Sequence, residues 1–211
     1  MCEVNEQRWW SYVRGFALKH IKNTSLLDIG CGPYPSSNPM SVISNQYVGI
    51  DIELKENFEG RCIIADAHHL PFKDSAFKAV SLIEVLEHLK NPVSALKEAV
   101  RVLENGGEIY ITTPNSSYLY YFVKNLFTKN LSDVSASYIE NGHLIEFDPR
   151  SLKRMLELVK VRIVESKGYL VPIPPRKLFL STKVGWKIAE FLGRHFPLIS
   201  SALLIKAVKL T

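Results

Sequence analysis

The chain has 211 residues, of which 46% are hydrophobic and 22% are charged, a composition typical of one packed globular domain. No apolar run reaches the roughly 18 residues of a spanning helix, and "MCEVNEQRWW" lacks the apolar core of a secretory signal. We therefore expect a cytoplasmic protein. The three cysteines, Cys2, Cys31 and Cys62, form no Cys-x-x-Cys pair, which argues against a zinc site or a redox dithiol.

The net charge of +5 is unevenly distributed along the chain. Residues 1–149 hold 13 Lys and Arg against 18 Asp and Glu, whereas residues 150–211 hold 13 against 3. The last third is thus strongly basic. Such a surface attracts an anionic substrate, an anionic membrane or nucleic acid, or it is only a solvated face, and charge alone does not separate these interpretations.

Helical and strand patterns alternate along the chain. Residues 5–22 carry apolar side chains at three- and four-residue intervals, which predicts an amphipathic helix. Seven short apolar runs are typical of buried strands: 25–30, 47–51, 61–66, 79–85, 108–114, 161–166 and 202–208. The alternation predicts an α/β protein in which helices cover both faces of a mainly parallel sheet.

Several helices are expected between these strands. Proline follows a capping residue at Pro39, Pro92 and Pro149, which is typical of a helix start, although only about two turns fit after Pro39. In the helix that begins at Pro92, the residues expected to line the buried face are Val93, Leu96, Val100 and Leu103. Gly106 and Gly107 are expected to end that helix.

Two segments break the alternation, and we interpret them as insertions within a single domain that spans residues 1–211. Residues 116–142 are rich in Tyr, Leu and Phe, and residues 168–201 contain a helical stretch from 184 to 196. Insertions after the carboxyl ends of strands commonly shape ligand sites in α/β proteins. On the predicted helix, one side carries Val184, Ile188, Phe191, Leu192 and Phe196, and the other carries Lys187, Glu190 and Arg194.

A glycine turn follows the first predicted strand in "LLDIGCGPYPSS". Gly30 and Gly32 allow a sharp bend and a close approach of the backbone to a ligand. Asp51 ends the next strand, 21 residues after Gly30, where a carboxylate can accept hydrogen bonds from both hydroxyls of a ribose. Asp66 ends the third strand, where it can accept a hydrogen bond from an exocyclic amine. These features predict an adenosine pocket.

The residues after Gly32 argue against a dinucleotide. A pyrophosphate site of this kind has a third glycine, whereas this chain has Pro33, Tyr34 and Pro35, and proline lacks a backbone donor. The methionine part of S-adenosylmethionine needs fewer donors. The turn therefore favours S-adenosylmethionine over a nicotinamide or flavin dinucleotide.

Four motifs in order, "LLDIGCG", "YVGIDIE", "ADAHHLPFKDSAFKAVSLIEVLEHL" and "LENGGEIYITTPN", resemble those of class I S-adenosylmethionine-dependent methyltransferases. Within that superfamily the chain is similar to the small-molecule group that includes quinone-biosynthesis O-methyltransferases. The similarity is clear over residues 24–115 and moderate over 143–166. It implies a Rossmann-like sheet of seven strands whose last strand, "ALLIKAVK", is antiparallel, and S-adenosylhomocysteine as the product.

The resemblance also implies roles for individual residues. It places Asp28, Gly30 and Gly32 at the methionine moiety and Asp51 at the ribose. It places Asp66 and Ala67 at the adenine, and Ile83 beside the sugar and the sulfonium. Two positions depart from the usual pattern: Tyr34-Pro35 replaces small residues, which bears on pocket shape, and Lys78 replaces an aspartate before the fourth strand. The segment 1–22 is expected to act as a lid, with Trp9 over the cofactor, or as a packing helix.

The "EVLEH" motif carries the candidate catalytic groups. In a helical segment, Glu84, Glu87 and His88 would share a face, and His143 matches a position where metal-using relatives place a further histidine. Such a set suits a divalent cation, but the motif also occurs in relatives not known to use metal, and we assign no metal. His88 and His143 are the candidate general bases, the alternative being a histidine that bonds the backbone at a helix end.

The acceptor is less constrained than the donor. The basic, apolar carboxyl-terminal part predicts a small molecule that is lipid-like or anionic, with peripheral membrane contact through residues 176–196 and Trp186 at the interface. The alternative is that this helix packs on the sheet or on a second subunit of a homodimer. Nucleic acid is disfavoured because no RNA-binding module is present. An RNA-modifying enzyme and a catalytically silent S-adenosylmethionine-binding protein stay open as alternative functions.

Overall fold

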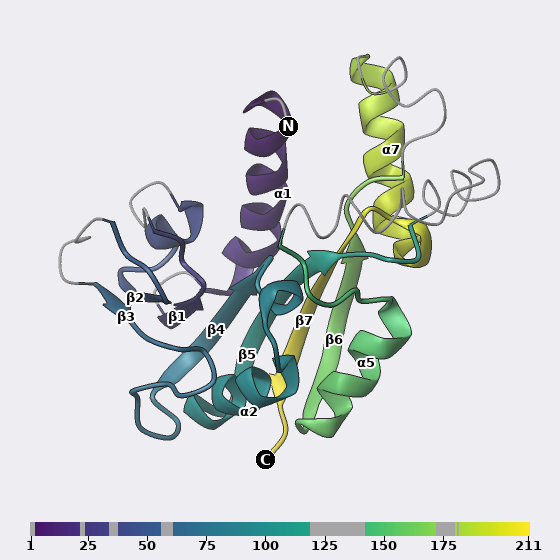
Figure 1. Cartoon of the computed structure of the whole chain (residues 1–211). Coiled ribbons are helices and arrows are strands. Elements are labelled where there is room, and N and C mark those ends of the chain that lie inside the picture. Colours follow the sequence, from purple (N-terminus) through teal and green to yellow (C-terminus); the bar gives the residue numbers. More distant parts are fainter. Residues whose placement is uncertain are drawn as a thin grey trace.

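The computed structural model describes residues 3–21, 24–33, 38–55, 61–118, 142–171, 180 and 182–211. A seven-stranded sheet with the order β3-β2-β1-β4-β5-β7-β6 forms its centre (Figure 1). All pairs from β3 to β5 are parallel, and β7 runs antiparallel to both β5 and β6. The predicted Rossmann-like fold with an antiparallel last strand is confirmed. The strands are β1 (Ser25–Ile29), β2 (Gln46–Asp51), β3 (Cys62–Ile64), β4 (Phe77–Ile83), β5 (Leu103–Pro114), β6 (Val161–Gly168) and β7 (Ala202–Lys209).

Helices cover both faces of the sheet and enclose two apolar cores. One core packs the helices α2 (Pro92–Val102) and α5 (Pro149–Leu158) on the sheet. The other packs α1 (Glu3–Ile21) and α7 (Lys183–His195) on the opposite face. Figure 1 shows α1 and α7 rising beside each other beyond the upper end of the sheet. Short 3-10 turns lie at Pro39–Val42, Leu86–His88 and Pro197–Ile199.

The predicted capping residues are in place at three helix starts. Asn38, Asn91 and Asp148 each accept a hydrogen bond from a backbone N–H in the first turn that follows. The segment after Asn38 forms only one 3-10 turn instead of the two helical turns predicted. Its neighbour β2 already begins at Gln46, so the chain has little room for a longer helix.

The buried face of α2 agrees with the prediction only in part, because the predicted Leu96 and Leu103 are fully buried but other residues complete the face. Its fully buried residues are Ala95, Leu96, Ala99 and Val102, whereas Val93 and Val100 are only partly buried. The helix ends at Val102, before the predicted glycine stop, because Leu103 already pairs with Phe77 in the sheet. Small alanines face the sheet, which lets α2 pack closely.

Helix α7 does not pack on the sheet through the apolar side that its periodicity marks, which was one of the alternatives considered. Val184, Ile188 and Phe191 are 68%, 41% and 57% exposed, so this apolar side faces away from the core. The helix packs instead through Gly185, Trp186, Ala189 and Gly193. A Cβ at Gly193 would lie 2.2 Å from the Tyr169 carbonyl oxygen, so glycine is what allows the helix to contact that backbone. None of the described helices combines the length and the apolarity needed to cross a membrane.

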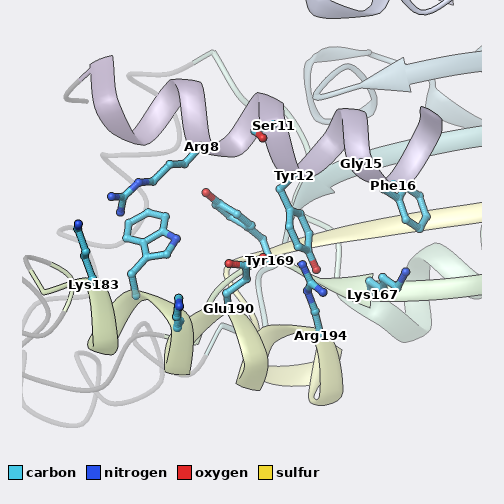
Figure 2. Close-up of a pocket in the computed structure, with 12 residues that line it drawn as sticks. Arg8, Ser11, Tyr12, Gly15, Phe16, Lys167, Tyr169, Lys183, Glu190 and Arg194 are labelled. Atoms are coloured by element: carbon cyan, nitrogen blue, oxygen red, sulfur yellow. Dashed lines mark hydrogen bonds and ion pairs between the residues drawn. The ribbon is translucent and has the colours of Figure 1, made fainter. Parts of the chain in front are cut away.

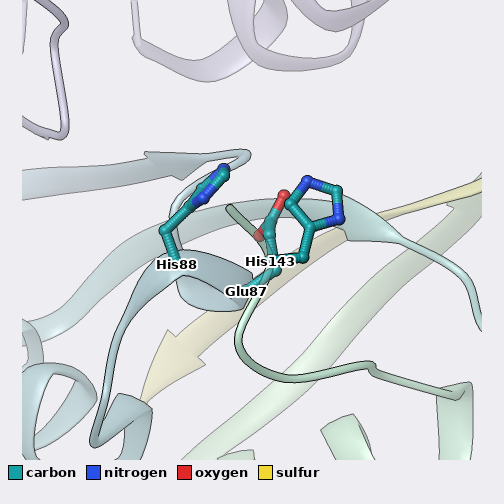
Figure 3. A group of neighbouring side chains, drawn as sticks. All are labelled: Glu87, His88 and His143. Carbon is teal, nitrogen blue, oxygen red and sulfur yellow. The ribbon is translucent and has the colours of Figure 1, made fainter. Parts of the chain in front are cut away.

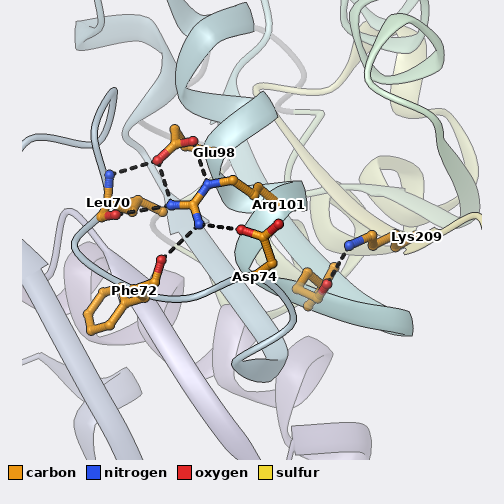
Figure 4. A network of polar contacts seen from close by, with 7 residues as sticks. Leu70, Phe72, Asp74, Glu98, Arg101 and Lys209 are labelled. Carbon is orange, nitrogen blue, oxygen red and sulfur yellow. Dashed lines mark hydrogen bonds and ion pairs between the residues drawn. The ribbon is translucent and has the colours of Figure 1, made fainter.

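A polar network fixes the loop between β3 and β4 to α2 (Figure 4). The Arg101 guanidinium donates to both carboxylate oxygens of Glu98, to Asp74 and to the carbonyl oxygens of Leu70 and Phe72, at 2.7–3.0 Å. Glu98 also accepts from the Leu70 backbone N–H. A planar guanidinium can serve all of these acceptors at once, which an ammonium cannot. The network therefore holds the segment that directly follows Asp66 and Ala67.

Candidate active site

The glycine turn is held at the carboxyl ends of two adjacent parallel strands. Gly30 and Gly32 have φ values of 76° and 84°, a region that glycine tolerates best. The backbone N–H groups of Gly30 and Cys31 donate to the Ile50 carbonyl oxygen at 2.8 and 3.0 Å, which fixes the turn to β2. A Cβ at Gly30 would lie 2.4 Å from a methyl carbon of Val85, so a larger residue does not fit there.

Asp51 braces the same turn from the end of β2. Its Oδ2 accepts from the Gly32 N–H at 2.9 Å, and its Oδ1 accepts from the Glu53 N–H at 3.3 Å. The side chain is partly exposed. Each carboxylate oxygen has two acceptor positions, so both oxygens keep capacity for further hydrogen bonds. The predicted ribose contact is compatible with this geometry and stays a prediction.

Asp28 lies beneath the turn and not in its opening. The residue is 1% exposed, and its carboxylate accepts from Ser81 Oγ at 2.6 Å, Asn38 Nδ2 at 2.9 Å and the Tyr47 hydroxyl at 3.1 Å. Burial raises the pKa of Asp28 to about 6, and the hydrogen bonds from the three donors oppose that rise. Asn38 also donates to the Cys31 carbonyl oxygen, so Asp28 orders the turn through a shared partner. Its contact with the methionine moiety stays a prediction.

The residues predicted at the adenine and the sugar line the neighbouring strand ends. Asp66 is exposed, and its Oδ1 accepts from the His68 backbone N–H at 2.8 Å and lies 2.6 Å from His68 Nδ1. These hydrogen bonds lower the pKa of Asp66. Ala67 and Ile83 are 7% and 8% exposed, on opposite faces of the sheet. The adenine and sugar contacts of these residues stay predictions.

The structure also describes the surroundings of Cys31, within the glycine turn, and of Trp9, the predicted lid residue. Cys31 is 2% exposed, and burial raises the pKa of its thiol, so it is a buried filler and not a nucleophile. The Trp9 ring packs edge-on against Tyr169, with 4.8 Å between the ring centroids. Tyr169 follows β6, the edge strand that lies four positions from β1 in the sheet. Tyr34, Pro35 and most of the 116–142 insertion lie outside the described residues.

The "EVLEH" motif and His143 meet in space (Figure 3). Glu87, His88 and His143 each place a potential ligand atom within 4.8 Å of the others, and the two imidazole rings are 4.8 Å apart between centroids. Glu87 is 1% exposed, and its Oε1 has no hydrogen-bond partner among the described residues, while its Oε2 accepts from the Thr113 hydroxyl at 3.1 Å. The group has the donor types that suit a divalent cation.

Glu84 does not join this group. Its backbone has a φ of 55°, and its carboxylate accepts from the Thr112 hydroxyl at 2.8 Å. The segment after it is a short 3-10 turn instead of the expected α-helix, which separates Glu84 from His88. The set of four ligands considered from the sequence is therefore reduced to Glu87, His88 and His143.

The two histidines differ in their environment. His88 is exposed, and its Nδ1 lies 3.1 Å from the Gly142 carbonyl oxygen, which is an acceptor. Nδ1 therefore carries the proton in the neutral ring, and Nε2 is left able to accept one. Burial and the neighbouring His88 lower the pKa of His143. The neutral form of His143 is thus favoured.

Glu87→Gln is expected to flatten the pH dependence of stability. Burial, and then the charge of Glu84, raise the pKa of Glu87, so the native state holds a proton that the unfolded chain releases above about pH 4.3. The free energy of unfolding should therefore fall as the pH rises through about 5 to 8, by at most about 1.4 kcal/mol per pH unit for this group. Urea unfolding at several pH values, with the exposed Glu157→Gln as control, measures this. If the free energy of unfolding changes with pH in the same way for Glu87→Gln and for the unmodified chain, the prediction is contradicted.

Sequence reasoning missed the polar partners of the acidic residues. Tyr47, Ser81 and Asn38 bind Asp28 from 10 to 53 residues away along the chain, and Thr112 and Thr113 bind Glu84 and Glu87 from β5. A signal was present in Thr112-Thr113, two polar residues at the end of a buried strand. In a parallel sheet such residues lie beside the ends of the neighbouring strands.

Comparisons with known proteins agree with the motifs. Residues 27–111 match the model of a methyltransferase domain. The chain is 28% identical over 128 residues to demethylmenaquinone methyltransferase from Chlamydia trachomatis, covering 59% of this chain and 56% of that protein. It is 29% identical over 112 residues to a probable tRNA methyltransferase 9B from Homo sapiens, covering 50% of this chain and 25% of that protein.

The fold is similar to a solved S-adenosylmethionine-dependent methyltransferase from Archaeoglobus fulgidus, with a TM-score of 0.60 at 20% identity over 96% of this chain and 94% of that one. The resemblance predicted from the four motifs is thus confirmed. The chain spans between 25% and 56% of the length of the curated relatives named above. The matched region includes the glycine turn, Asp51, Asp66 and the "EVLEH" motif.

Proposed function

We propose that this chain, whose residues 27–111 match the model of a methyltransferase domain, transfers a methyl group from S-adenosylmethionine to a small-molecule acceptor. The observation that carries the proposal is the glycine turn bonded to Asp51. Gly30 and Gly32 are partly exposed at the carboxyl ends of two parallel strands, Cys31 between them is buried, and the Gly32 N–H is bonded to a carboxylate suited to a ribose. Ligands of α/β proteins bind at such strand ends.

The residues present fit the donor in distinct roles. Gly30 and Gly32 let the backbone approach the methionine part, Asp51 would hold the ribose, and Asp66 with Ala67 would border the adenine. When bound, S-adenosylmethionine supplies an activated methyl group, so the protein mainly needs to align donor and acceptor and to exclude water. A neutral imidazole at His88 or His143 would take the proton from a hydroxyl acceptor.

Calorimetric titration with S-adenosylhomocysteine tests the donor site directly. We expect one binding site per chain, and no heat of binding to the unmodified protein would contradict the proposal. Incubation with isotopically labelled S-adenosylmethionine against lipid, quinone, small-phenol and RNA fractions then identifies the acceptor class. Label in RNA alone would favour the alternative of an RNA-modifying enzyme. Donor binding with no transfer to any fraction would favour a silent binding protein.

We further propose that α7 contacts an anionic membrane surface, within the segment 176–196 predicted from the sequence. The exposed Val184, Ile188 and Phe191 form an apolar side, and Lys183 and Lys187 lie on the same helix. An amphipathic helix with basic residues binds anionic bilayers through both features. Residues 176–179 and 181 lie outside the described part of the chain.

Co-sedimentation with vesicles tests this contact. We expect the protein to pellet with phosphatidylglycerol-containing vesicles at low salt and less with phosphatidylcholine vesicles, because about 1 kcal/mol per basic residue is available near an anionic surface. Ile188→Glu combined with Phe191→Glu should abolish pelleting, whereas the exposed Val164→Glu on β6 should not. No pelleting of the unmodified chain at low salt would exclude membrane contact and leave packing on a second subunit as the alternative.

A further inference from the structure

A cavity of about 620 Å³ lies between α1 and α7. Its lining includes Tyr12 and Phe16 from α1, Tyr169 after β6, and Trp186 with Lys187 from α7. Figure 2 shows the labelled side chains of both helices facing one another across this space. The volume is within the range of sites that hold a small organic molecule, about 300–1,000 Å³. We call this cavity the α1–α7 groove.

The groove is separate from the glycine turn. Tyr169 directly follows β6, and β6 is four positions from β1 in the sheet order. At Tyr169, four strand spacings correspond to on the order of 19 Å. The described residues that line the groove include none of the predicted donor-site residues Gly30, Gly32, Asp51 and Asp66. A molecule in the groove therefore does not occupy the place of the methyl donor, although both sites lie toward the carboxyl ends of parallel strands.

Aromatic side chains form the interior of the groove. Tyr169 packs at 5.1 Å from Tyr12 and at 6.4 Å from Trp186, measured between ring centroids. Trp186 and Tyr169 are each 8% exposed, so the rings are held by their neighbours. Fixed rings of this kind offer flat apolar surface to a ring or a hydrocarbon chain without loss of side-chain freedom.

Positive charge gathers at the rim of the groove. Arg8 lies over the Trp186 ring at 4.4 Å, and Lys183 and Lys187 stand one turn apart on α7. No ion pair joins these three cations to an acid within the described part of the chain, and all three are exposed. Among the described residues that line the groove, Glu190 is the only acid, and it is paired with Arg194 at 2.6 Å. The rim is thus complementary to an anion.

One buried polar group of the groove is unpaired. The Tyr169 hydroxyl has no hydrogen-bond partner among the residues described, although its side chain is more than nine-tenths buried. Figure 2 shows this hydroxyl extending between the two helices on the side of Arg8. A buried hydroxyl without a partner is costly, and an acceptor atom brought by a ligand would satisfy it.

We propose that the α1–α7 groove binds an anionic amphiphile, a molecule whose ring or hydrocarbon part lies against Tyr169 and Trp186 and whose anionic group meets Lys183, Lys187 and Arg8. This inference rests on the proposed function, because we take the amphiphile to be the methyl acceptor. The groove then holds the part of the acceptor that does not react. The acceptor is then elongated, because its anionic end and its methylated atom lie at different places along the sheet.

Fluorescence titration with two matched probes tests the groove. The probes are 1-anilinonaphthalene-8-sulfonate and N-phenyl-1-naphthylamine, which share their rings but differ in the sulfonate. We expect saturable binding of one sulfonate probe per chain and about tenfold weaker binding of the uncharged probe, because hydrogen bonds to a charged group contribute about 1.5–3 kcal/mol. Dodecyl phosphate below its micelle concentration should displace the sulfonate probe, and inorganic phosphate should not.

Variants separate the groove from other surfaces. Lys183→Glu combined with Lys187→Glu should weaken the sulfonate probe at least about tenfold, whereas Lys97→Glu, an exposed change on α2 across the sheet, should leave its affinity unchanged. Unchanged binding in the double variant, equal affinity for both probes, or displacement by inorganic phosphate would overturn the proposal. The titration contains no methyl donor, so its failure is distinguishable from failure to bind S-adenosylhomocysteine, which the double variant should still bind normally.

Discussion

Asp51→Ala is expected to weaken binding of S-adenosylhomocysteine by about 100-fold. A charged carboxylate that accepts two hydrogen bonds from a ribose contributes a few kcal/mol, and about 2.7 kcal/mol corresponds to that change. The substitution also removes the acceptor of the Gly32 N–H, which is bound at 2.9 Å in the structure. Both losses act in the same direction, because the turn that would hold the methionine part loses its brace.

Isothermal titration calorimetry measures this effect, and two further variants separate its causes. Asp51→Asn keeps an oxygen that can accept from Gly32 but removes the charge, so an intermediate affinity is expected. Glu53→Ala removes another acid two residues away, on the exposed surface, and should change the affinity less than about twofold, since surface substitutions rarely have large effects. An Asp51→Ala variant that binds as tightly as the unmodified chain would show that this carboxylate only ends the strand.

Local signals in the sequence were sufficient for most of the fold. Each of the seven apolar runs overlaps a strand, and the caps at Asn91 and Asp148 begin helices where they were expected. These features depend on neighbours within a few residues, which the sequence displays directly. Periodicity identified only part of the buried face of α2 and did not identify the packing side of α7. It marks large apolar residues, whereas alanine and glycine permit the closest packing on a sheet.

The candidate site was predictable only in part, because some of its contacts join residues that are far apart in the sequence. Motif spacing predicted that Gly30, Gly32 and Asp51 lie in one pocket. In the structure, a hydrogen bond joins Gly32 to Asp51. The α1–α7 groove was not predicted, because Tyr12 and Gly168, which are hydrogen-bonded at 2.9 Å, are 156 residues apart. The basic last third of the sequence indicated an anionic partner, but only the fold brings Arg8 to the same rim as Lys183 and Lys187.

His88→Ala is expected to lower kcat by about 100-fold or more, with little change in the affinity for S-adenosylhomocysteine. General-base catalysis contributes roughly 10²–10⁴ in rate, and a base acts on the acceptor and not on the donor. The Gly142 carbonyl fixes the proton on His88 Nδ1, so Nε2 can accept the acceptor's proton. The measurement is the rate of methyl transfer to the acceptor found with labelled donor, with His69→Ala, an exposed loop histidine, as control.

The pH profile distinguishes a base from a structural histidine and from a metal ligand. If His143 is the base, its lowered pKa moves the acid limb of kcat below about pH 6.5, and His143→Ala removes that limb. A histidine that only holds the Gly142 loop would lower stability without changing the profile. A metal site would give a different result: a chelator would abolish activity, a divalent cation would restore it, and Glu87→Gln would prevent that rescue. Glu87, His88 and His143 would then act as metal ligands, and the assignment of a general base without metal would be wrong.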